Sequence, residues 1–322
     1  MKKVVVLINA MSSNPTPDEL DVLMQADAIE VELHTLGYQL ERLFLGLDMQ
    51  SVAEKLKNIA PHFVVNLVES IDNSGKLLYF APAFLEHLQL PFTGSGSEAM
   101  FITTNKMLAK SLMIQNGLPT PEWISSDFTA KLNPSKTYIS KPVWEEASVG
   151  ISDENIVKGD TVSVNNFLKK HADKPYFFEE FIEGREFNIS ILGGKNGPEV
   201  LPMAEIIFEN FPAGKPKIVG YEAKWEESSF EYSHTPRSFG VEKTDPKLAA
   251  KLKKICFESW KLFNLKGYVR IDFRVDKNNE PQILEINANP CLSPDAGFYA
   301  ASQRAGYSFK QVVERIIEDV WK

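Results

Sequence analysis

Apolar residues along the first hundred positions follow two alternating patterns. Residues 4–8 are wholly apolar, which is typical of a parallel strand buried on both faces. We expect two more strands at residues 38–44 and 63–67, with helices at residues 17–37 and 51–60. The first helix is expected to bury one side, formed by Leu20, Leu23, Met24, Ala28 and Val31. This alternation of strands and helices predicts a small doubly wound domain with a parallel sheet.

The rest of the chain combines further strands with a few longer helices. A Gly/Ser/Pro cluster at residues 91–97 precedes a helix that runs through Lys106 and ends at Gly117. Strands are expected at residues 138–143, 176–182, 186–192, 199–207, 267–275 and 282–287. Asp245 caps a helix before the last two strands, and an amphipathic helix over residues 309–321 must pack on the domain. A chain of 322 residues with these elements predicts two or three packed lobes.

Composition and charge exclude several functional classes. The net charge is −8, and no cluster of lysines and arginines offers a footprint for nucleic acid. No apolar stretch approaches the roughly 20 residues that span a bilayer. Two cysteines, Cys256 and Cys291, make no disulfide framework in a chain of this length. We therefore expect a soluble, cytoplasmic protein that binds neither nucleic acid nor membrane.

A hairpin near the C-terminus places acidic and amide side chains opposite each other. If its turn lies at residues 278–279, Asp272 faces Glu285 and Arg270 faces Asn287. Two directly opposed carboxylates repel each other, and a divalent cation would remove that repulsion. Oxygen ligands of this kind favour Mg²⁺ over zinc. A solvated sheet face neutralised by Arg270 explains the same pattern, so the hairpin alone leaves both interpretations open.

Cationic residues suited to a nucleotide occur in the middle of the chain. Lys141 precedes a proline in a strand-like run, and Lys106 lies in the helix after the Gly/Ser/Pro cluster. The loop at residues 148–150 follows two glutamates, and its N–H groups could meet phosphate oxygens. Each lysine taken alone is more typical of a surface position. The sequence contains no Walker P-loop, no G-x-G-x-x-G and no G-x-S-x-G.

Nine short runs, taken together and in this order, resemble the D-alanine–D-alanine ligases and the wider ATP-grasp superfamily. They are LPFTGSG (90–96), NK (105–106), NGLPTP (116–121), SKP (140–142), SVG (148–150), EEFIEGRE (179–186), YEAK (221–224), RID (270–272) and LEINANP (284–290). The resemblance covers almost the whole chain. It implies an ATP-grasp fold with mixed α/β and α+β character. The N-terminal doubly wound domain would span residues 1–105, and two nucleotide-grasping lobes would span 106–183 and 184–322.

The resemblance also implies roles for individual residues. Lys106 and Lys141 would hold the α- and β-phosphates of ATP, and Glu186 would bind the ribose. The hinge between the lobes would read the adenine edge through the backbone of Glu179, Glu180 and Ile182. Asp272, Glu285 and Asn287 match the ligands of two Mg²⁺ ions, for which Mn²⁺ is an alternative. Lys224 would lie near the γ-phosphate, Arg270 near the developing oxyanion, and Ser148 in a loop that closes over the site together with residues 208–240.

This set of residues implies an enzyme, a ligase that forms C–N bonds. ATP would convert a carboxylate to an acyl phosphate, an amine would attack the acyl carbon, and ADP and phosphate would be released. Both substrates are expected to be small molecules, and amino acids are the expected class. Relatives in the family are often homodimers, so a dimer is left open here.

Several residues depart from the family pattern where the amino-acid substrates would bind. Cys291 stands where the family has glycine, and a nucleophilic role for this thiol is a remote alternative. Ala296 and Gly297 replace the Ser-Leu pair that grips the carboxylate of the second substrate. The acidic or thiol side chains expected to line the substrate site are Asp21, Glu69, Cys291 and Asp295. Glu69 stands where the family commonly has histidine, and Glu19 competes with Asp21 as the acid that binds the first amino group.

These departures favour a ligase whose acceptor is not D-alanine. Trp225, where many relatives carry a tyrosine that closes the lid, adds a further departure. The alternatives are a true D-alanine–D-alanine ligase, a non-catalytic ATP-binding protein and another ATP-grasp chemistry such as carboxylation. The complete set of phosphate and metal residues argues against the non-catalytic alternative. No biotin or bicarbonate machinery is visible in the sequence, which argues against carboxylation.

Overall fold

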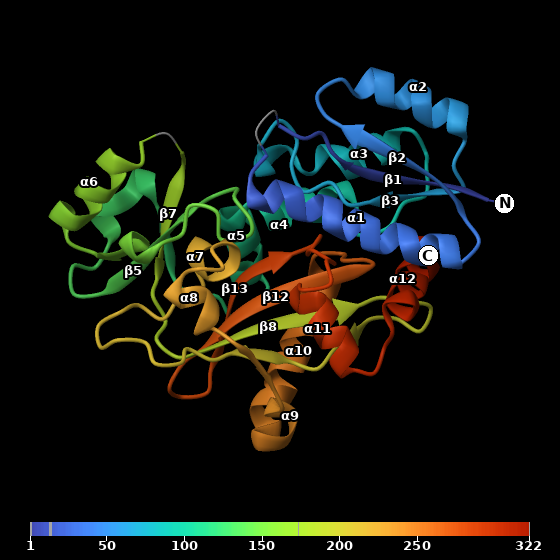
Figure 1. The fold of residues 1–322 in the computed structure, drawn as a ribbon. Helices are drawn as coiled ribbons and strands as arrows, with labels where there is room; N and C mark the ends of the chain where they lie inside the picture. Colours follow the sequence, from blue (N-terminus) through green and yellow to red (C-terminus); the bar gives the residue numbers. More distant parts are fainter. Residues whose placement is uncertain (1, 13–14, 173, 322) are drawn as a thin grey trace.

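The computed structural model describes residues 2–12, 15–172 and 174–321, which form three sheets and the helices around them (Figure 1). The first sheet is parallel and has the strand order β2-β1-β3, with β1 spanning Lys3–Asn9, β2 Gln39–Leu45 and β3 Phe63–Asn66. Alternate residues of β1 enter different clusters of buried side chains, on opposite faces of the sheet. The wholly apolar run follows from this burial on both faces, and the predicted doubly wound domain is confirmed.

Helix α1 (Pro17–Thr35) buries a different side from the one predicted. Its buried apolar residues are Val22, Ala26, Ile29 and Leu33. Leu20, Met24 and Val31, assigned above to the buried side, are 46%, 51% and 62% exposed. The helix carries apolar residues on two sides, and only packing against the sheet decides which side is covered.

The helix predicted through Lys106 is two helices, α4 (Ser97–Thr104) and α5 (Lys106–Gln115). Asn105 between them has an extended backbone (ψ 94°), and its side chain accepts a hydrogen bond from the Leu108 backbone N at 3.1 Å. This is an N-cap, for which asparagine is well suited. Because Lys106 is the first residue of α5, its N–H has no acceptor within the helix, and it donates to the Val143 carbonyl at 3.1 Å. Helix α3 (Phe80–His87) precedes both and was not predicted.

The central sheet is antiparallel, with strand order β4-β7-β5-β6. Its strands are β4 (Trp123–Ser125), β5 (Thr137–Pro142), β6 (Ile156–Lys158) and β7 (Tyr176–Glu180), and α6 (Thr161–Lys170) covers it. The sequence predicted β5 and β7 but not the short β4 and β6 or the helix. A separate cluster of buried residues, which includes Tyr138, Phe167 and Phe178, holds this lobe together. Figure 1 shows the lobe projecting to one side of the molecule.

The C-terminal sheet has the order β11-β10-β8-β12-β13, with β9 also paired to β8. Its long strands are β8 (Arg185–Leu192), β12 (Tyr268–Val275) and β13 (Pro281–Asn287). The strand predicted at 199–207 is split into β9 (Glu199–Val200) and β10 (Ala204–Ile206), which pair with β8 one residue out of register. Pro202 lies in the interruption, and proline cannot donate a ladder hydrogen bond. Strand β11 (Arg237–Phe239) forms the edge.

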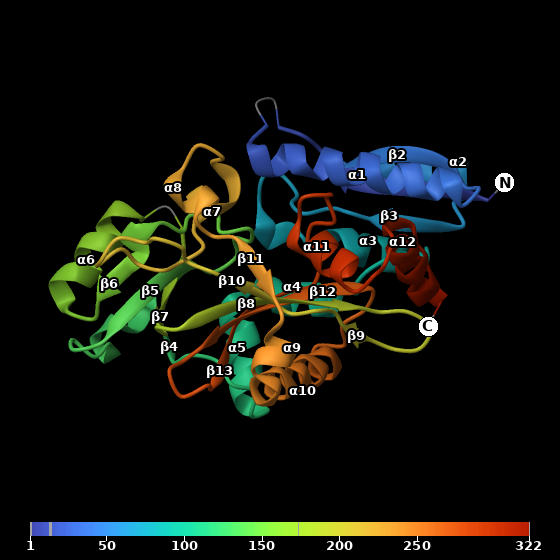
Figure 2. The same ribbon diagram turned by 60° about the horizontal axis from the view of Figure 1, so that its bottom comes forward.

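The first and last parts of the chain share their buried cores. One cluster joins one face of β1 to β12, β13 and α10 (Pro246–Leu262). The other joins the opposite face to α1, α11 (Gly297–Arg304) and α12 (Phe309–Glu318), so the final helix packs as predicted. Figure 2 shows α11 and α12 beside the N-terminal sheet. Within the described residues, no helix combines the length and apolar character needed to cross a membrane.

Candidate active site

Two adjoining hollows lie where the lobes meet. The larger has a volume of about 810 Å³ and is lined by residues of the N-terminal domain, of the loop at 145–150, of residues 219–237 and of the segment that follows β13. The smaller, of about 90 Å³, lies between the central and C-terminal sheets. Lys224 and Glu145 line both hollows. The two predicted phosphate-binding lysines and all the predicted hinge and ribose residues line the smaller hollow. Of the loop at residues 148–150, Ser148 lines the smaller hollow, whereas Val149 and Gly150 line the larger one.

The carboxylate hairpin has the predicted register. Asp272 pairs with Glu285 and Arg270 with Asn287 across β12 and β13, and a bulge after Asp272 shifts the pairing nearer the turn. Arg270 Nε lies 2.8 Å from Asp272 Oδ1, and Lys106 Nζ lies 3.7 Å from Glu285 Oε2. Burial alone would raise the pKa of Glu285, but Lys106, Lys224 and Arg270 lower this pKa to about 2. The Glu285 carboxylate is therefore ionised at neutral pH.

The donor atoms on this hairpin fit a hard divalent cation. Two carboxylates and the Asn287 amide lie at paired or alternate positions of neighbouring strands, and all offer oxygen donors. In the part of the chain that the structure describes, no group of three or more His, Cys, Asp or Glu side chains is set to hold a metal. The donors on the hairpin are two carboxylates and one amide, so they do not form a group of that kind. Zinc, which prefers nitrogen and sulfur, does not fit these donors.

The predicted phosphate-binding lysines are held by glutamates. Lys141 Nζ lies 2.7 Å from Glu179 Oε1, and Lys110 pairs with the other oxygen of the same carboxylate. Glu179 is fully buried, so it can reach a ligand at the hinge only through its backbone. Burial lowers the pKa of Lys110 to about 8, although Glu179 opposes this shift. The sequence analysis missed Lys110, whose spacing of four from Lys106 on one helix was the available signal.

Residues predicted to form the hinge and to bind the ribose also have ion-pair partners. Glu186 Oε2 lies 2.7 Å from Arg274 Nη2, and Glu180 Oε2 lies 2.7 Å from Lys136 Nζ. Burial raises the pKa of Glu186, with Arg274 acting in the opposite direction. Arg274 lies on β12 two residues after Asp272, on the same face, and was not singled out in the sequence.

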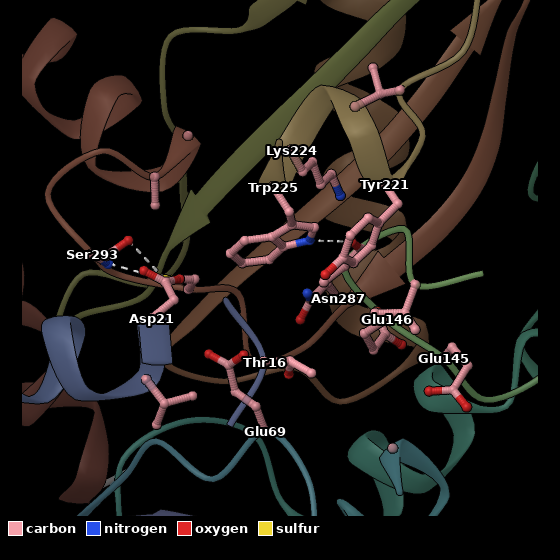
Figure 3. A pocket seen from close by; sticks show the side chains of 18 of the residues that line it. Thr16, Asp21, Glu69, Glu145, Glu146, Tyr221, Lys224, Trp225, Asn287 and Ser293 are labelled. Carbon is pink, nitrogen blue, oxygen red and sulfur yellow. Dashed lines mark hydrogen bonds between the residues drawn. The ribbon is translucent and has the colours of Figure 1, made fainter. Parts of the chain in front are cut away.

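The two segments expected to act as lids contact each other. The Ser148 hydroxyl donates to the Val219 carbonyl at 2.8 Å, and Trp225 Nε1 donates to the Ala147 carbonyl at 3.0 Å. Trp225 and Lys224 belong to α7 (Tyr221–Trp225), inside the stretch that was predicted to be a polar lid. Figure 3 shows Tyr221, Lys224 and Trp225 across the cavity from Asp21 and Glu69. Ser148 thus uses its hydroxyl to hold the two segments together.

The structure distinguishes Asp21 from Glu19. Glu19 accepts hydrogen bonds from Ser12 and from the Thr16 backbone, the latter at 3.0 Å, as part of the capping box of α1. Burial would raise the pKa of Glu19, but these bonds lower it. Glu19 and Asp21 both line the cavity, and Asp21 lies 2.8 Å from the Cys291 sulfur. Glu19 is held by the capping box, whereas Asp21 is positioned beside Cys291.

Cys291 is poorly suited to nucleophilic chemistry. Burial, followed by the nearby carboxylates of Glu69 and Asp21, raises the pKa of its thiol well above the ordinary value. The Ser293 hydroxyl lies 3.1 Å from the sulfur and donates to Asp295 Oδ1 at 2.8 Å. A thiol in this environment stays protonated at neutral pH, so the nucleophilic alternative loses its support.

Two charged residues of the cavity were missed in the sequence. Arg237 on β11 donates to the Asp295 carbonyl at 3.1 Å, and its Nε lies 3.5 Å from where a Cβ on Gly297 would be. Glu146 lies in the loop before Ser148, with its Oε1 3.7 Å from Lys106 Nζ. The pair Glu145-Glu146 was visible before the flexible loop. Nothing in the sequence marked Arg237, because its approach to Gly297 joins distant segments.

Comparisons with known proteins agree with this geometry. The family described as "D-ala D-ala ligase C-terminus" matches residues 117–318. A D-alanine–D-alanine ligase of Carboxydothermus hydrogenoformans is 29% identical over 309 residues, which cover 92% of each chain. The crystal structure of D-alanine–D-alanine ligase from Bacillus anthracis complexed with ATP has a TM-score of 0.76 at 20% identity, covering 100% of this chain and 98% of that one. VanG D-Ala:D-Ser ligase from Enterococcus faecalis has a TM-score of 0.73 at 15% identity, covering 99% of both chains.

Proposed function

Since this chain belongs to the D-alanine–D-alanine ligase family and is an ATP-dependent ligase of the ATP-grasp type, we propose that it joins a carboxylate to an amine other than D-alanine. The carboxylate oxygen would attack the γ-phosphorus of ATP, and ADP would leave. The amine would then attack the acyl carbon, lose a proton and displace phosphate. Amino acids are the proposed substrate class.

The observation that carries the choice of acceptor lies at the start of α11. Ala296 and Gly297 occupy this position and supply no hydroxyl. Arg237 fills the space above Gly297, so a larger side chain there would meet its guanidinium. Glu69 and Asp295 add acidic side chains to the same cavity. A cavity with this set of side chains differs from one built for a second D-alanine, because the groups that bind its carboxylate have changed.

The nucleotide half of the proposal rests on the hairpin and the lysines. Lys106 and Lys141 would bind phosphate oxygens, and Lys224, which lines both hollows, would face the phosphoryl group that moves. Mg²⁺, or Mn²⁺ in its place, would be held by Asp272, Glu285 and Asn287, and when bound would neutralise charge on the phosphoryl group. Arg270 would stabilise the oxyanion formed when the amine attacks. The contact between residues 147–148 and residues 219–225 would exclude water from the acyl phosphate.

A D-alanine–D-alanine ligase is the second candidate, and the names of the relatives favour it. Phosphate release from Mg²⁺-ATP against single and paired D- and L-amino acids separates the two. Phosphate release that requires an amino acid or amino-acid pair other than D-alanine, together with formation of an amide, supports the proposal. Release with D-alanine alone, with formation of the dipeptide, would contradict the proposed acceptor and establish the second candidate.

Replacement of Glu285 by glutamine tests the metal assignment. We expect Glu285→Gln to lower kcat by more than about 100-fold, because even outer-shell partners of a bound metal contribute about 10- to 100-fold. The measurement is ADP release at saturating Mg²⁺-ATP. Glu280→Gln on the same hairpin is the matched control, since Glu280 is 57% exposed and pairs with Lys251. Both variants should melt like the wild type, and normal turnover in Glu285→Gln would remove Glu285 from the metal site.

The homodimer remains a prediction. Size-exclusion chromatography with light scattering, at micromolar concentration, measures the mass of the protein in solution. A mass near twice the 36.3 kDa of the chain would confirm a dimer, and a mass near 36.3 kDa would contradict it.

A further inference from the structure

Glu146 is a partly buried glutamate that the proposed reaction leaves without a role. It lines the large cavity, and its side chain is 19% exposed. One oxygen, Oε1, lies 3.7 Å from Lys106 Nζ. The other, Oε2, is buried and has no hydrogen-bond partner among the residues that the structure describes. A buried carboxylate oxygen without a partner costs free energy, so a ligand that completes it would be favoured.

The neighbouring glutamate shows that this arrangement is specific to position 146. The Glu145 carboxylate pairs with Lys174 at 3.0 Å, and its backbone carbonyl accepts from Lys106. Figure 3 places Glu146 on the same side of the cavity as Asn287 and Tyr221. The loop that carries Glu146 is held by the Ala147 carbonyl and the Ser148 hydroxyl, which bond to Trp225 and Val219. Contact between the two lid segments therefore fixes where Glu146 points.

Binding of the nucleotide would change the charge balance around this carboxylate. The charged groups that act on Glu146 are Lys106, Glu285, Arg270 and Lys224. Lys106 already faces a second carboxylate, with Glu285 Oε2 also 3.7 Å from its Nζ. If a phosphate group of the nucleotide binds Lys106, as the proposed function requires, Glu146 loses its nearest cation. A new cation in the cavity would then restore the balance.

We propose that Glu146 binds the amino group of the acceptor as its ammonium ion and holds it beside Arg270, where the acyl carbon is expected. This inference rests on the proposed ligase function and names the residue that recognises the amine. A carboxylate and an ammonium form a charge-assisted hydrogen bond, which is among the strongest available to a buried oxygen. The acceptor then binds after ATP, because binding of the nucleotide phosphate to Lys106 removes that lysine from Glu146. Before its nitrogen attacks the acyl carbon, the ammonium gives one proton to the Glu146 carboxylate.

The electrostatics of the free protein agree with a cation site. Burial raises the pKa of Glu146 to about 7, Lys106 opposes this shift, and Glu285 adds to it. An ammonium placed against the free oxygen would lower this pKa again and keep the carboxylate ionised. Arg270 already bonds to Asp272, whereas Lys224 lines both hollows and is proposed to face the phosphoryl group.

Two small amines test the proposal on the whole protein. Hydroxylamine is uncharged at neutral pH, whereas methylamine is an ammonium ion. With Mg²⁺-ATP and the carboxylic acid that gives the largest ADP release, the wild type should form both the hydroxamate and the methylamide. We expect Glu146→Gln to keep the rate of hydroxamate formation and the KM for ATP. Its KM for methylamine should rise about 10- to 100-fold, the effect of removing one charged hydrogen bond.

Glu154→Gln, at an exposed glutamate of the same lobe that pairs with Lys170, is the control and should behave like the wild type with both amines. Glu146→Asp keeps the charge and should recover part of the affinity for methylamine. An unchanged KM for methylamine in Glu146→Gln would overturn this inference but leave the proposed ligase function standing. So would a weaker affinity for Mg²⁺-ATP or a loss of hydroxamate, because Glu146 would then belong to the nucleotide or metal site. A wild type that forms no hydroxamate with any acid would overturn the proposed function and the inference with it.

Discussion

At the scale of single residues, the surrounding side chains decide how reactive a residue is, which the residue type alone leaves open. Cys291 lies between Asp21 and Ser293, and burial with two nearby carboxylates raises the pKa of its thiol. A raised thiol pKa keeps the unreactive protonated form through the neutral range, so its alkylation should accelerate only as the pH rises toward that pKa. Glu19 and Asp21 show the same dependence, since Glu19 belongs to a helix cap and Asp21 contacts the Cys291 thiol.

We therefore expect Cys291→Ser to keep kcat close to the wild-type value, because serine preserves a donor to Asp21. Loss of a covalent nucleophile would instead cost on the order of 10⁶ in kcat. Iodoacetamide at pH 7 should label Cys291 slowly in the folded protein and rapidly in denaturant, followed by peptide mass spectrometry. Cys256, which is fully buried, serves as the internal reference. Fast labelling of the folded protein, or a collapse of kcat, would restore the nucleophilic role.

At the scale of elements, the short helix α7 and the loop at residues 145–150 act together. Their contacts join the central lobe to the C-terminal lobe above the cavity. Trp225→Phe removes the hydrogen bond to the Ala147 carbonyl and keeps most of the ring, which loosens the closed arrangement by about 1 kcal/mol. Water should then reach the acyl phosphate more often.

The expected result is more ADP released for each amide formed, by about fivefold or less for a change of that size. Parallel assays of ADP and amide product measure the ratio. Trp123→Phe on β4 is the control, because Trp123 packs edge-on against Phe177 in the central lobe. An unchanged ratio in Trp225→Phe would mean that this contact plays no part in excluding water.

At the scale of the whole molecule, the buried clusters predict how the protein unfolds. The N-terminal sheet and the C-terminal sheet share two clusters, whereas the central sheet has its own. Phe273 on β12 and Phe167 on α6 are both buried, at 0% and 5% exposure. Truncation of a buried phenylalanine to alanine costs about 3–5 kcal/mol. The two substitutions should therefore destabilise different parts of the molecule.

Hydrogen exchange followed by mass spectrometry distinguishes these effects. Phe167→Ala should speed exchange within residues 123–180 and leave the two shared clusters protected. Phe273→Ala should speed exchange across both the N-terminal and C-terminal sheets and lower the main melting temperature. Equal loss of protection everywhere in Phe167→Ala would show that the central lobe is not an independent unit.

The sequence alone determined those features that depend on neighbours along the chain. An uninterrupted apolar run marked β1, and a tight turn fixed the facing of Asp272 with Glu285 and of Arg270 with Asn287. Strand register and turn position are local, so they can be read from spacing. The nine runs of family-like residues predicted where nucleotide and metal would bind, and the two predicted phosphate-binding lysines line one hollow together with the predicted hinge and ribose residues.

Only the tertiary structure decided which of several locally equivalent choices is used. Helix α1 has two apolar sides, and contact with the sheet selected the one that contains Ile29. Asn105 ends one helix and caps the next because Lys106 bonds to Val143. The free oxygen of Glu146 and the approach of Arg237 to Gly297 depend on segments far apart in sequence. Such features arise from the packing of whole lobes, which no local spacing specifies.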